Sequence, residues 1–399
     1  MKITKIECYP ITIPWARVRH VNGEEVPGSE SVLIKIHTDE GIVGVGETGG
    51  TALVYTGDTQ ESIIGFLKDV GPQLLLGSDP TNINRLIADM DSAAKYSDQA
   101  MAIVDCALYD LVGKKLDVPV YELLGGLAQD KLELGWVIGY GTFDTPEEAA
   151  EIASNVKEAG YESAKLKVGR DSVSEDLENL EAVREAVGDD FRIGIDANGT
   201  WDYFEAVHAL RKMEQYDPLL CEQPIPWEEI DNLARLRQQV DIPICADESA
   251  TKPSDVMRIV EQDAADALFI KLTKVGGIRK GQKWLSVAET AGLPVMTGSM
   301  VGSAFETAWQ AHFLFANEWM GHMEQENVGN LIVHDQFESV ENPITNDLGK
   351  NPDFPKVEDG YMHPPEGAGL GVELDEELLE EYITDGKEPV VIEEDKATA

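Results

Sequence analysis

The sequence predicts an α/β protein in which an N-terminal α+β segment precedes a closed barrel of parallel strands. From about residue 131, short apolar strands alternate with amphipathic helices about 25 residues apart, which is typical of βα units and a parallel sheet. About eight such strands follow one another within roughly 200 residues, which favours a closed barrel over an open doubly wound sheet. The strands carry no Gly-x-Gly-x-x-Gly phosphate turn, so a dinucleotide-binding fold is not indicated.

The segment before the barrel combines an antiparallel meander with helices. Alternating apolar residues on both sides of Thr38-Asp39-Glu40-Gly41 predict a hairpin, and the stretches 17–27 and 49–58 predict mobile loops. Helical periodicity then continues up to the glycine pair Gly125-Gly126, which ends a short helix. The predicted elements are strands at 1–15 and 31–48 and helices at 60–76, 80–95, 98–115 and 119–126.

The barrel elements follow from apolar runs that are separated by helix start and stop signals. The first barrel helix opens with Thr145-Pro146-Glu147-Glu148, a capping box with proline at the first helical position. After the barrel, residues 345–399 return to polar, Pro- and Gly-rich sequence with one helix at 375–382. The predicted barrel strands are 132–140, 163–168, 191–195, 219–221, 242–246, 267–272, 293–296 and, as the weakest, 319–323.

The charge of the chain limits its partners. Its 399 residues include 74 acidic and 32 basic side chains, and the formal net charge is −42. Such a surface repels nucleic acid and anionic membranes, so we expect neither as a partner. The acidic residues are spread among regular apolar runs, which argues against disorder and indicates adaptation to high salt. A halophilic source is therefore our hypothesis.

The cysteines and the N-terminus indicate the compartment. Cys8, Cys106, Cys221 and Cys245 form no CxxC pair and have no metal-ligand spacing, so we expect buried free thiols, as in cytosolic proteins. The first residues lack the apolar core of a signal peptide, and no apolar run approaches the 18 or so residues of a membrane span. The sequence therefore predicts a soluble, cytoplasmic protein.

Charged residues end five successive barrel strands. Each strand end is one βα unit from the next, and the residues are Lys167, Asp196, Glu222, Asp247 and Lys271. Because the carboxyl ends of all strands in a parallel barrel lie on one face, where the active sites of such barrels are found, we expect these side chains to converge.

The three carboxylates among them are hard oxygen ligands, which suit Mg²⁺ or Mn²⁺ with the remaining positions left to water or substrate. Zinc is disfavoured because no histidine or cysteine holds a ligand position at these strand ends. The alternative interpretation is that each carboxylate only caps the helix that follows its strand. Three in succession, flanked by lysine-bearing strands, make a shared metal site the better hypothesis.

Three lysines flank the carboxylates. Lys165 and Lys167 share one face of their strand, where mutual repulsion should lower the pKa of at least one and leave a neutral amine as general base. The alternative is an exposed edge strand with two solvated lysines. Lys271 follows the carboxylates, so a lysine would face each side of a substrate α-carbon. Removing a proton next to a carboxylate requires stabilisation of the enediolate, which a metal supplies as a Lewis acid.

The chain resembles the enolase superfamily, and within it the muconate lactonizing enzyme subgroup, through one series of motifs. The series is Lys-x-Lys, Asp-Ala-Asn, Glu-Gln-Pro, Ala-Asp-Glu-Ser and Ile-Lys with a following Gly-Gly. The resemblance covers most of the chain. It implies an α+β capping domain at 1–127, a modified TIM barrel of the (β/α)7β type at 128–345, and a C-terminal segment at 346–399 that returns to the cap and ends in an acidic tail.

The resemblance also implies roles for individual residues. Asp196, Glu222 and Asp247 would bind Mg²⁺ or Mn²⁺. Lys167 and Lys271 would be the two acid/base groups, while Lys165 would tune Lys167 and approach the substrate carboxylate. The supporting or substrate-binding candidates are Asn198, Glu248, Glu324 as the glutamate of the eighth strand, and His20 and Tyr55 in the two capping loops.

The implied activity is that of an isomerase that acts on a small-molecule carboxylate. The leading outcomes are a muconate-type cycloisomerase and a racemase or epimerase of an N-substituted amino acid, with an o-succinylbenzoate synthase-like dehydratase third. A catalytically silent barrel used for binding is the rival from another class. Met296-Thr297-Gly298 excludes members of the mandelate racemase type, which carry an Asp–His pair, and Glu324-Gln325-Glu326 in place of Asp-x-Asp argues against a dipeptide substrate. The implied assembly is a homo-oligomer, a dimer or an octamer.

Overall fold

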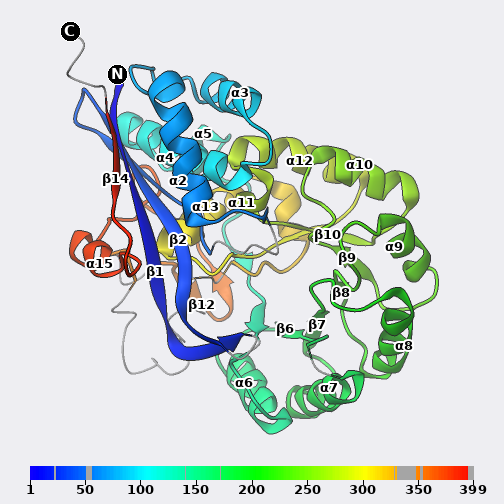
Figure 1. Cartoon of the computed structure of the whole chain (residues 1–399). Helices are drawn as coiled ribbons and strands as arrows, with labels where there is room; N and C mark the ends of the chain where they lie inside the picture. The colour runs from blue at the N-terminus through cyan, green and yellow to red at the C-terminus, as the bar shows by residue number, and fades with distance from the viewer. Residues whose placement is uncertain are drawn as a thin grey trace.

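The computed structural model describes residues 1–21, 24–50, 56–139, 141–170, 172–327, 329, 347–350 and 354–393, without the side chains of 16–27. Figure 1 shows a strand-rich N-terminal part beside a ring of strands with helices around its outside. The predicted combination of an α+β cap with a modified barrel is confirmed.

The N-terminal sheet is antiparallel and includes the end of the chain. Its strand order is β14-β1-β2-β3. Because strand side chains alternate between two faces, Ile6 and Cys8 on β1 and Ile34 and Ile36 on β2 are buried together, in one apolar cluster with residues of the helices. Ile6 pairs with Ile392, so the C-terminal segment closes the outer edge of the sheet. The strands are β1 (Ile3–Val21), β2 (Glu24–Thr38), β3 (Val43–Glu47) and β14 (Val390–Glu393), and the helical elements are α2 (Gln60–Val70), η1 (Gly71–Leu75), α3 (Ile83–Ala93), α4 (Asp98–Leu116) and α5 (Val120–Leu123).

The first predicted mobile loop is a continuation of the hairpin. Arg19 pairs with Val26 and His20 with Glu25, so the prediction for 17–27 is wrong for the described backbone. The strand pairing at 17–27 could not be predicted because polar and apolar residues do not alternate regularly there. The side chain of His20 and the whole of Tyr55 lie outside the described residues.

The barrel sheet is parallel, with the order β11-β10-β9-β8-β7-β6-β5. Isolated bridges from Gln325 to Leu134 and from Glu326 to Gly298 join its two edges, so residues 325–326 complete the ring. The predicted eighth strand at 319–323 is wrong, because η3 (Glu318–His322) is a 3₁₀ helix there. A short apolar run does not distinguish a strand from a buried helical turn. The strands are β5 (Trp136–Ile138), β6 (Ser163–Lys167), β7 (Arg192–Asp196), β8 (Cys221–Glu222), β9 (Ile244–Ala246), β10 (Ala267–Ile270) and β11 (Val295–Thr297).

Helices connect successive barrel strands, and their caps follow from the sequence. Thr145 accepts a hydrogen bond from the Glu148 amide, which is one half of the predicted capping box, whereas the Glu148 side chain accepts from the Asp144 amide at 2.7 Å. The connecting helices are α6 (Pro146–Glu158), α7 (Val173–Val187), α8 (Tyr203–Met213), η2 (Glu214–Tyr216), α9 (Ile230–Arg237), α10 (Pro253–Gln262), α11 (Leu272–Val275), α12 (Ile278–Ala291) and α13 (Ala304–Phe315). The remaining elements are β4 (Leu132–Glu133), β12 (Val357–Glu358), β13 (Tyr361–Met362) and α15 (Glu376–Glu381).

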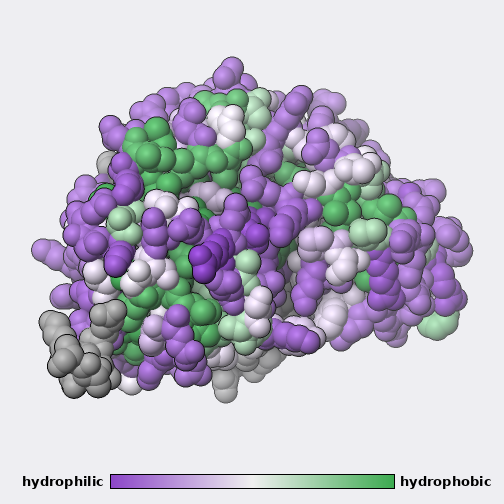
Figure 2. Space-filling view, turned by 90° about the horizontal axis from the view of Figure 1, so that it is seen from above, coloured by the Kyte–Doolittle hydropathy of each residue, from purple (hydrophilic) through white to green (hydrophobic). Residues whose placement is uncertain are grey.

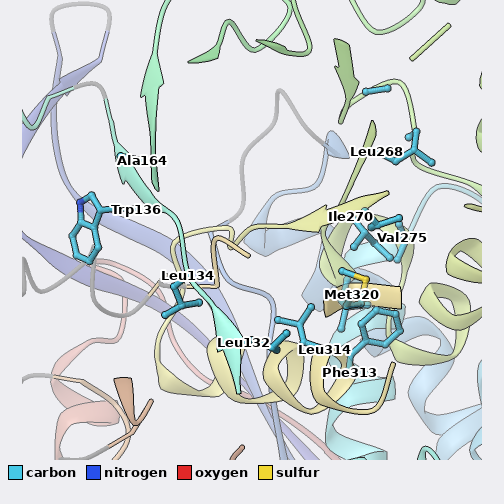
Figure 3. Close-up of a cluster of buried hydrophobic side chains, with 14 of the residues drawn as sticks. Leu132, Leu134, Trp136, Ala164, Leu268, Ile270, Val275, Phe313, Leu314 and Met320 are labelled. Atoms are coloured by element: carbon cyan, nitrogen blue, oxygen red, sulfur yellow. The ribbon is translucent and has the colours of Figure 1, made fainter. Parts of the chain in front are cut away.

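Two apolar clusters hold the barrel together. The larger one lies between strands and helices, and Figure 3 shows part of it, with Ile270 beside Val275 and Leu314 beside Phe313. The smaller cluster lies on the opposite faces of the strands, inside the ring, and consists of Leu220, Cys245, Ala267, Phe269 and Met296. The ring is therefore filled with side chains below its carboxyl end. All four cysteines are buried and free, as predicted. No helix among the described residues is long and apolar enough to cross a bilayer.

The acidic surface should make stability depend on salt. Figure 2 shows one face on which hydrophilic residues cover most of the area between smaller apolar patches. With a net charge of −42, raising KCl from about 0.1 M to 1 M shortens the Debye length from about 10 Å to 3 Å and screens the repulsion. We therefore expect the melting temperature to rise with KCl in calorimetry. Sucrose at matched osmolality is the reference, since it stabilises by exclusion from the surface without screening charge, and KCl should raise the melting temperature more than sucrose does. A melting temperature unaffected by KCl would contradict the high-salt hypothesis.

Candidate active site

Adjacent strands bring the predicted residues to the same end of the barrel. Lys167 is paired in register with Asp196, and Asp196 with Glu222, so three neighbouring strands end in a row of charged side chains. Asp247 directly follows β9, and Lys271 directly follows β10. All five predicted strand-end residues therefore lie at the carboxyl end of the parallel sheet, as the sequence predicts.

Each of the three predicted ligands contacts a lysine. The Lys167 ammonium donates to Asp196 Oδ2 at 2.5 Å, and the Lys271 ammonium donates to Asp247 Oδ2 at 2.5 Å. Lys165 donates to Glu222 Oε2 at 2.5 Å. The carboxylates lie between Lys167 on one side and Lys271 on the other, which is the arrangement that the spacing predicts.

The electrostatics of Lys165 differ from the prediction. Burial alone would lower its pKa, but the charges of Glu222, Glu326 and Asp196 outweigh burial, so its pKa is well above the ordinary value. Glu326 Oε2 lies 2.5 Å and Asp196 Oδ2 lies 3.7 Å from the Lys165 ammonium. The lowering predicted for at least one of the two lysines does not occur at Lys165, because three carboxylates lie 2.5 to 3.7 Å from its ammonium group.

The three candidate ligands also have displaced pKa values. Burial and the neighbouring Asp196 raise the pKa of Glu222 well above 4.5. Burial would raise the pKa of Asp196, but Lys167 and Lys165 hold it below its ordinary range. Burial is likewise outweighed at Asp247, where two lysines hold the pKa well below the ordinary value. The pKa of Glu222 is therefore displaced in the opposite direction from those of Asp196 and Asp247.

Asn198 and Glu248 form a bridge beside Lys167. The Asn198 side chain accepts from the Lys167 ammonium at 2.7 Å and donates to Glu248 Oε1 at 3.0 Å. Asn198 has a φ of 45°, and its amide donates to Asp196 Oδ1 at 2.8 Å. Burial, with Asp247 next, raises the pKa of Glu248 to about 7. Both residues therefore lie where the predicted supporting role places them.

The donor set can accommodate a divalent cation. Glu222 Oε1 and Glu248 Oε2 are buried oxygens without a hydrogen-bond donor among the described residues, and a buried unsatisfied carboxylate oxygen is costly. Carboxylate oxygens are the ligands that hard cations prefer. Within the described part of the chain, no three acidic, histidine or cysteine side chains already surround one point that could hold a metal. Asp196 and Asp247 each have an oxygen that accepts from a lysine ammonium. The three carboxylates are therefore the type of ligand that a divalent cation needs, and the side chains of Asp196 and Asp247 would rotate to bind it.

Glu326, rather than Glu324, lies beside the lysines. Glu324 Oε2 is 3.5 Å from Arg192, which begins β7 at the end of the sheet opposite Asp196. Glu326 contacts Lys165, and burial raises the pKa of its carboxyl group. Glu324 and Glu326 are two residues apart, so both side chains point to the same face of the segment 324–326. The bridge from Glu326 to Gly298 shows that Glu326 is the one at the carboxyl end of the barrel strands.

Two further residues that the sequence reasoning missed hold Asp247. Gln223 Oε1 accepts from the Asp247 amide at 3.1 Å. The fully buried Lys274 ammonium donates to the Asp247 carbonyl at 2.5 Å, to the Phe269 carbonyl at 3.1 Å and to Asp247 Oδ1. The sequence signal for Lys274 was its place one helical turn after Lys271, but no element was predicted there.

Replacing Lys274 by methionine is expected to destabilise the fold by about 3–5 kcal/mol, which is typical when one partner of a buried ion pair is removed. The change leaves the Asp247 carbonyl and one carboxylate oxygen without this donor. Urea unfolding gives the free energy of unfolding. Lys212→Met on the exposed face of α8 is the matched control, expected within about 0.5 kcal/mol of wild type. An equally small effect of Lys274→Met would contradict the assigned ion pair.

A buried carboxylate pair joins the N-terminal sheet to the barrel next to the site. Glu47 at the end of β3 accepts from the Ser303 amide at 3.1 Å, at the start of α13. Glu306 accepts from the amides of Met300 and Gly302, both at 2.7 Å. The loop after β11 is therefore fixed by one carboxylate from each part of the chain.

Stability is expected to fall as the pH rises from about 5 to 8. Burial raises the pKa of Glu47 to about 6 and that of Glu306 to about 8, from an ordinary value of 4.5. The folded state therefore holds these protons more tightly, so their stabilising contribution is complete below pH 4.5 and is lost as the pH passes 6 and then 8. A pKa that differs by one between the folded and unfolded states changes the free energy of unfolding by about 1.4 kcal/mol.

The pKa values of Asp196 and Asp247 are instead lowered from the ordinary value of 3.8. Their contribution to stability is therefore lost as the pH falls below that value, which is below the range in which Glu47 and Glu306 titrate. Calorimetry from about pH 5 to 9 should show a falling melting temperature for wild type and a flatter profile for Glu306→Gln. Identical profiles would show that Glu306 does not titrate in this range.

Comparison with known proteins identifies the class and then the family. The sequence model described as "Enolase C-terminal domain-like" matches residues 147–378, and that of the "Mandelate racemase / muconate lactonizing enzyme, N-terminal domain" matches residues 12–125. The fold and the strand-end carboxylates thus define an enolase-type enzyme. The chain belongs to the mandelate racemase/muconate lactonizing enzyme family, whose enzymes are generally divalent-metal dependent.

Relatives of known activity are isomerases. N-succinyl-L-Arg/Lys racemase of Bacillus cereus is 33% identical over 96% of this chain and 98% of its own length. Muconate cycloisomerase 1-1 of Acinetobacter lwoffii is 28% identical over 96% of this chain and 97% of its own length. The crystal structure of a mandelate racemase/muconate lactonizing family protein from Azoarcus sp. EbN1 superposes with a TM-score of 0.90 at 42% identity, covering 98% of this chain and all of that one.

Proposed function

We propose that this chain is a Mg²⁺- or Mn²⁺-dependent isomerase that moves the α-proton of a small carboxylate substrate, with an N-acylated amino acid as the leading substrate class. The observation that carries the proposal is the placement of Lys167 and Lys271 against opposite members of the carboxylate row. A substrate carboxylate in that row would have its α-carbon between the two ammonium groups. One lysine could then remove the proton, and the other could return it on the opposite face.

Each residue in this proposal has a defined task. Asp196, Glu222 and Asp247 would hold the divalent ion, which when bound supplies Lewis-acid stabilisation of the charge that develops on the substrate carboxylate. Lys165, ionised among its carboxylates, would attract the substrate carboxylate. Asn198 would orient the Lys167 ammonium through its 2.7 Å hydrogen bond. Phe269 packs against both lysines, since its ring centroid lies 4.4 Å from the Lys165 ammonium and 5.3 Å from the Lys271 ammonium.

The substrate class rests on one relative and on the chemistry of the site. The racemase of Bacillus cereus acts on N-succinyl amino acids and is similar to this chain over nearly its whole length. A second candidate is cycloisomerisation of a muconate-like diacid, which the similarity to muconate cycloisomerase supports. A cytoplasmic location, a homo-oligomeric assembly, the domain boundaries and a halophilic source remain predictions.

Metal-dependent exchange of deuterium from D₂O into candidate acids tests the proposal. N-succinyl, N-acetyl and N-carbamoyl derivatives of both amino-acid enantiomers, together with cis,cis-muconate, form the panel. NMR should show exchange at the α-carbon of both enantiomers of an N-acyl amino acid with Mg²⁺ and none with a chelator. Conversion of muconate alone, to a lactone that carries deuterium on the carbon beside its free carboxylate, would favour cycloisomerisation, because muconate itself has no α-proton on a saturated carbon. Metal binding without exchange in any compound would support the catalytically silent barrel instead.

A further inference from the structure

A second cavity, separate from the lysine–carboxylate site, lies where the N-terminal part meets the barrel. Its volume is about 610 Å³, within the range of small-molecule sites. It is bounded by the end of α3 and the starts of α10 and α12, which lie together along the upper side of Figure 1. Five cationic side chains line it: Lys95, Lys252, Arg279, Lys280 and Lys283.

The charge of this cavity is opposite to that of the chain. Acidic residues outnumber basic ones 74 to 32 in the sequence, yet only Asp91 and Asp98 face the five cations among the described residues that line the cavity. Both aspartates form ion pairs with Lys280, whose ammonium lies 2.6 Å from Asp91 Oδ1 and 2.9 Å from Asp98 Oδ1. Lys280 is therefore paired with two carboxylates, and the positive charge of the lining comes from the four other cations, Lys95, Lys252, Arg279 and Lys283.

Three rim lysines have no acidic partner in the described part of the chain. Neither Lys95 nor Lys283 takes part in an ion pair there. The Lys252 ammonium lies 4.7 Å from the centroid of the Tyr96 ring, while the carboxylate of Asp255 accepts from the Lys252 backbone amide, at 2.8 Å, rather than from this ammonium. With so many carboxylates available, an acidic neighbour for each lysine would be the ordinary outcome. Instead, several lysine ammonium groups line the same cavity, and a ligand with several oxygen atoms could accept hydrogen bonds from more than one of them.

Tyr96 adds a flat apolar surface to the same rim. Its ring is 76% exposed, and its φ of 61° lies in the left-handed region, which large side chains rarely adopt. Such a conformation costs of order 1–3 kcal/mol and persists where the surrounding structure requires it. Here it presents the ring beside Lys252, between the end of α3 and the start of α10.

The cavity is connected to the predicted catalytic loops. Thr251 and Lys252 follow Asp247 by only a few residues, and Val275 follows Lys274 directly. The buried Trp284 on α12 donates to the Ala250 carbonyl at 2.8 Å, which attaches the cationic helix to the loop after β9. A ligand here would contact two segments, the loop after β9 and the turn after β10, that also carry Asp247 and Lys271.

We propose that this cavity binds a small polyvalent oxyanion, a phosphate or a dicarboxylate, held between the rim lysines and Tyr96. The site is independent of the proposed isomerase reaction, and its occupant would clamp α3 to α10 and α12. Replacing Lys252 and Lys283 with glutamine removes two rim charges, and both side chains are exposed, so the fold is retained.

Calorimetric titration of the metal-free protein with inorganic phosphate, and separately with succinate, tests the proposal at constant ionic strength. Wild type should bind one of the two saturably at one site per chain. The Lys252→Gln/Lys283→Gln variant should bind it at least tenfold more weakly. Lys68→Gln/Lys212→Gln, two exposed lysines on α2 and α8, removes the same charge elsewhere and should bind like wild type.

Three results would overturn the proposal. The first is no saturable binding of either anion to wild type, and the second is equal binding by the cavity variant, which would place the anion elsewhere, for instance on the catalytic lysines. The third is a change of assembly in light scattering, confined to the cavity variant, which would make this surface an interface between copies. Comparing phosphate with succinate shows which oxyanion chemistry the rim prefers.

Discussion

Lys167→Ala and Lys271→Ala are expected to stop α-proton exchange from opposite enantiomers of the same substrate. The two ammonium groups contact different carboxylates, Asp196 and Asp247, on separate strands, so each can reach one face of an α-carbon between them. Each variant should therefore retain exchange of the enantiomer that the other lysine serves. Net racemisation should fall in both by more than the 10² to 10⁴ typical of general acid–base catalysis, because an unassisted α-proton is very weakly acidic.

NMR in D₂O measures this for each variant with each enantiomer, once the substrate panel has given a substrate. Lys68→Ala, on the exposed face of α2, is the matched control and should exchange both enantiomers at the wild-type rate. If the reaction is a cycloisomerisation, loss of the lysine that acts only electrostatically should cost about 10² to 10³, as for one oxyanion contact. Wild-type exchange of both enantiomers by both variants would remove Lys167 and Lys271 from the mechanism.

Glu222→Gln is expected to abolish turnover and to weaken Mn²⁺ binding by more than 100-fold. Mutation of a residue that only supports a ligand typically lowers metal affinity by about 10- to 100-fold, so a larger loss identifies Glu222 as a ligand. The substitution preserves the shape of the side chain, and Lys165 keeps Glu326 as a partner, so the fold should survive. Titration of chelator-treated protein with Mn²⁺, followed by electron paramagnetic resonance, gives the affinity independently of activity.

Glu324→Gln provides the control for this experiment. Glu324 is a buried glutamate of the same barrel, but it lies beside Arg192 at the other end of the strands. Its substitution should leave Mn²⁺ affinity within about tenfold of wild type. Equal losses in the two variants would show that the effect comes from disturbing the barrel, and an unaffected Glu222→Gln protein would remove Glu222 from the ligand set.

The row of catalytic candidates could be predicted because each position depends on local pattern. Asp196 and Glu222 end short apolar strands one βα unit apart, and parallel topology alone brings such ends together. No knowledge of side-chain packing was needed for that step. The same logic predicted the antiparallel hairpin of β2 and β3, where alternation and a turn coincide.

The remaining features depend on contacts between distant segments. Choosing Glu326 over Glu324 requires the bridge to Gly298, which no local pattern encodes. The role of Lys274 depends on where one helical turn places its ammonium against Asp247. The pKa of Lys165 depends on how many carboxylates surround it, and the sequence showed only the neighbouring lysine.

The pairing of β14 with β1 has a consequence for how the chain is made. β1 is synthesised long before the segments that cover its outer edge, which are residues 382–384 and β14. Until those segments have been made, this edge of backbone donors and acceptors stays open, and open edges pair with other chains. The N-terminal sheet therefore completes only after β14 has been made, and nascent chains are most prone to associate before that point.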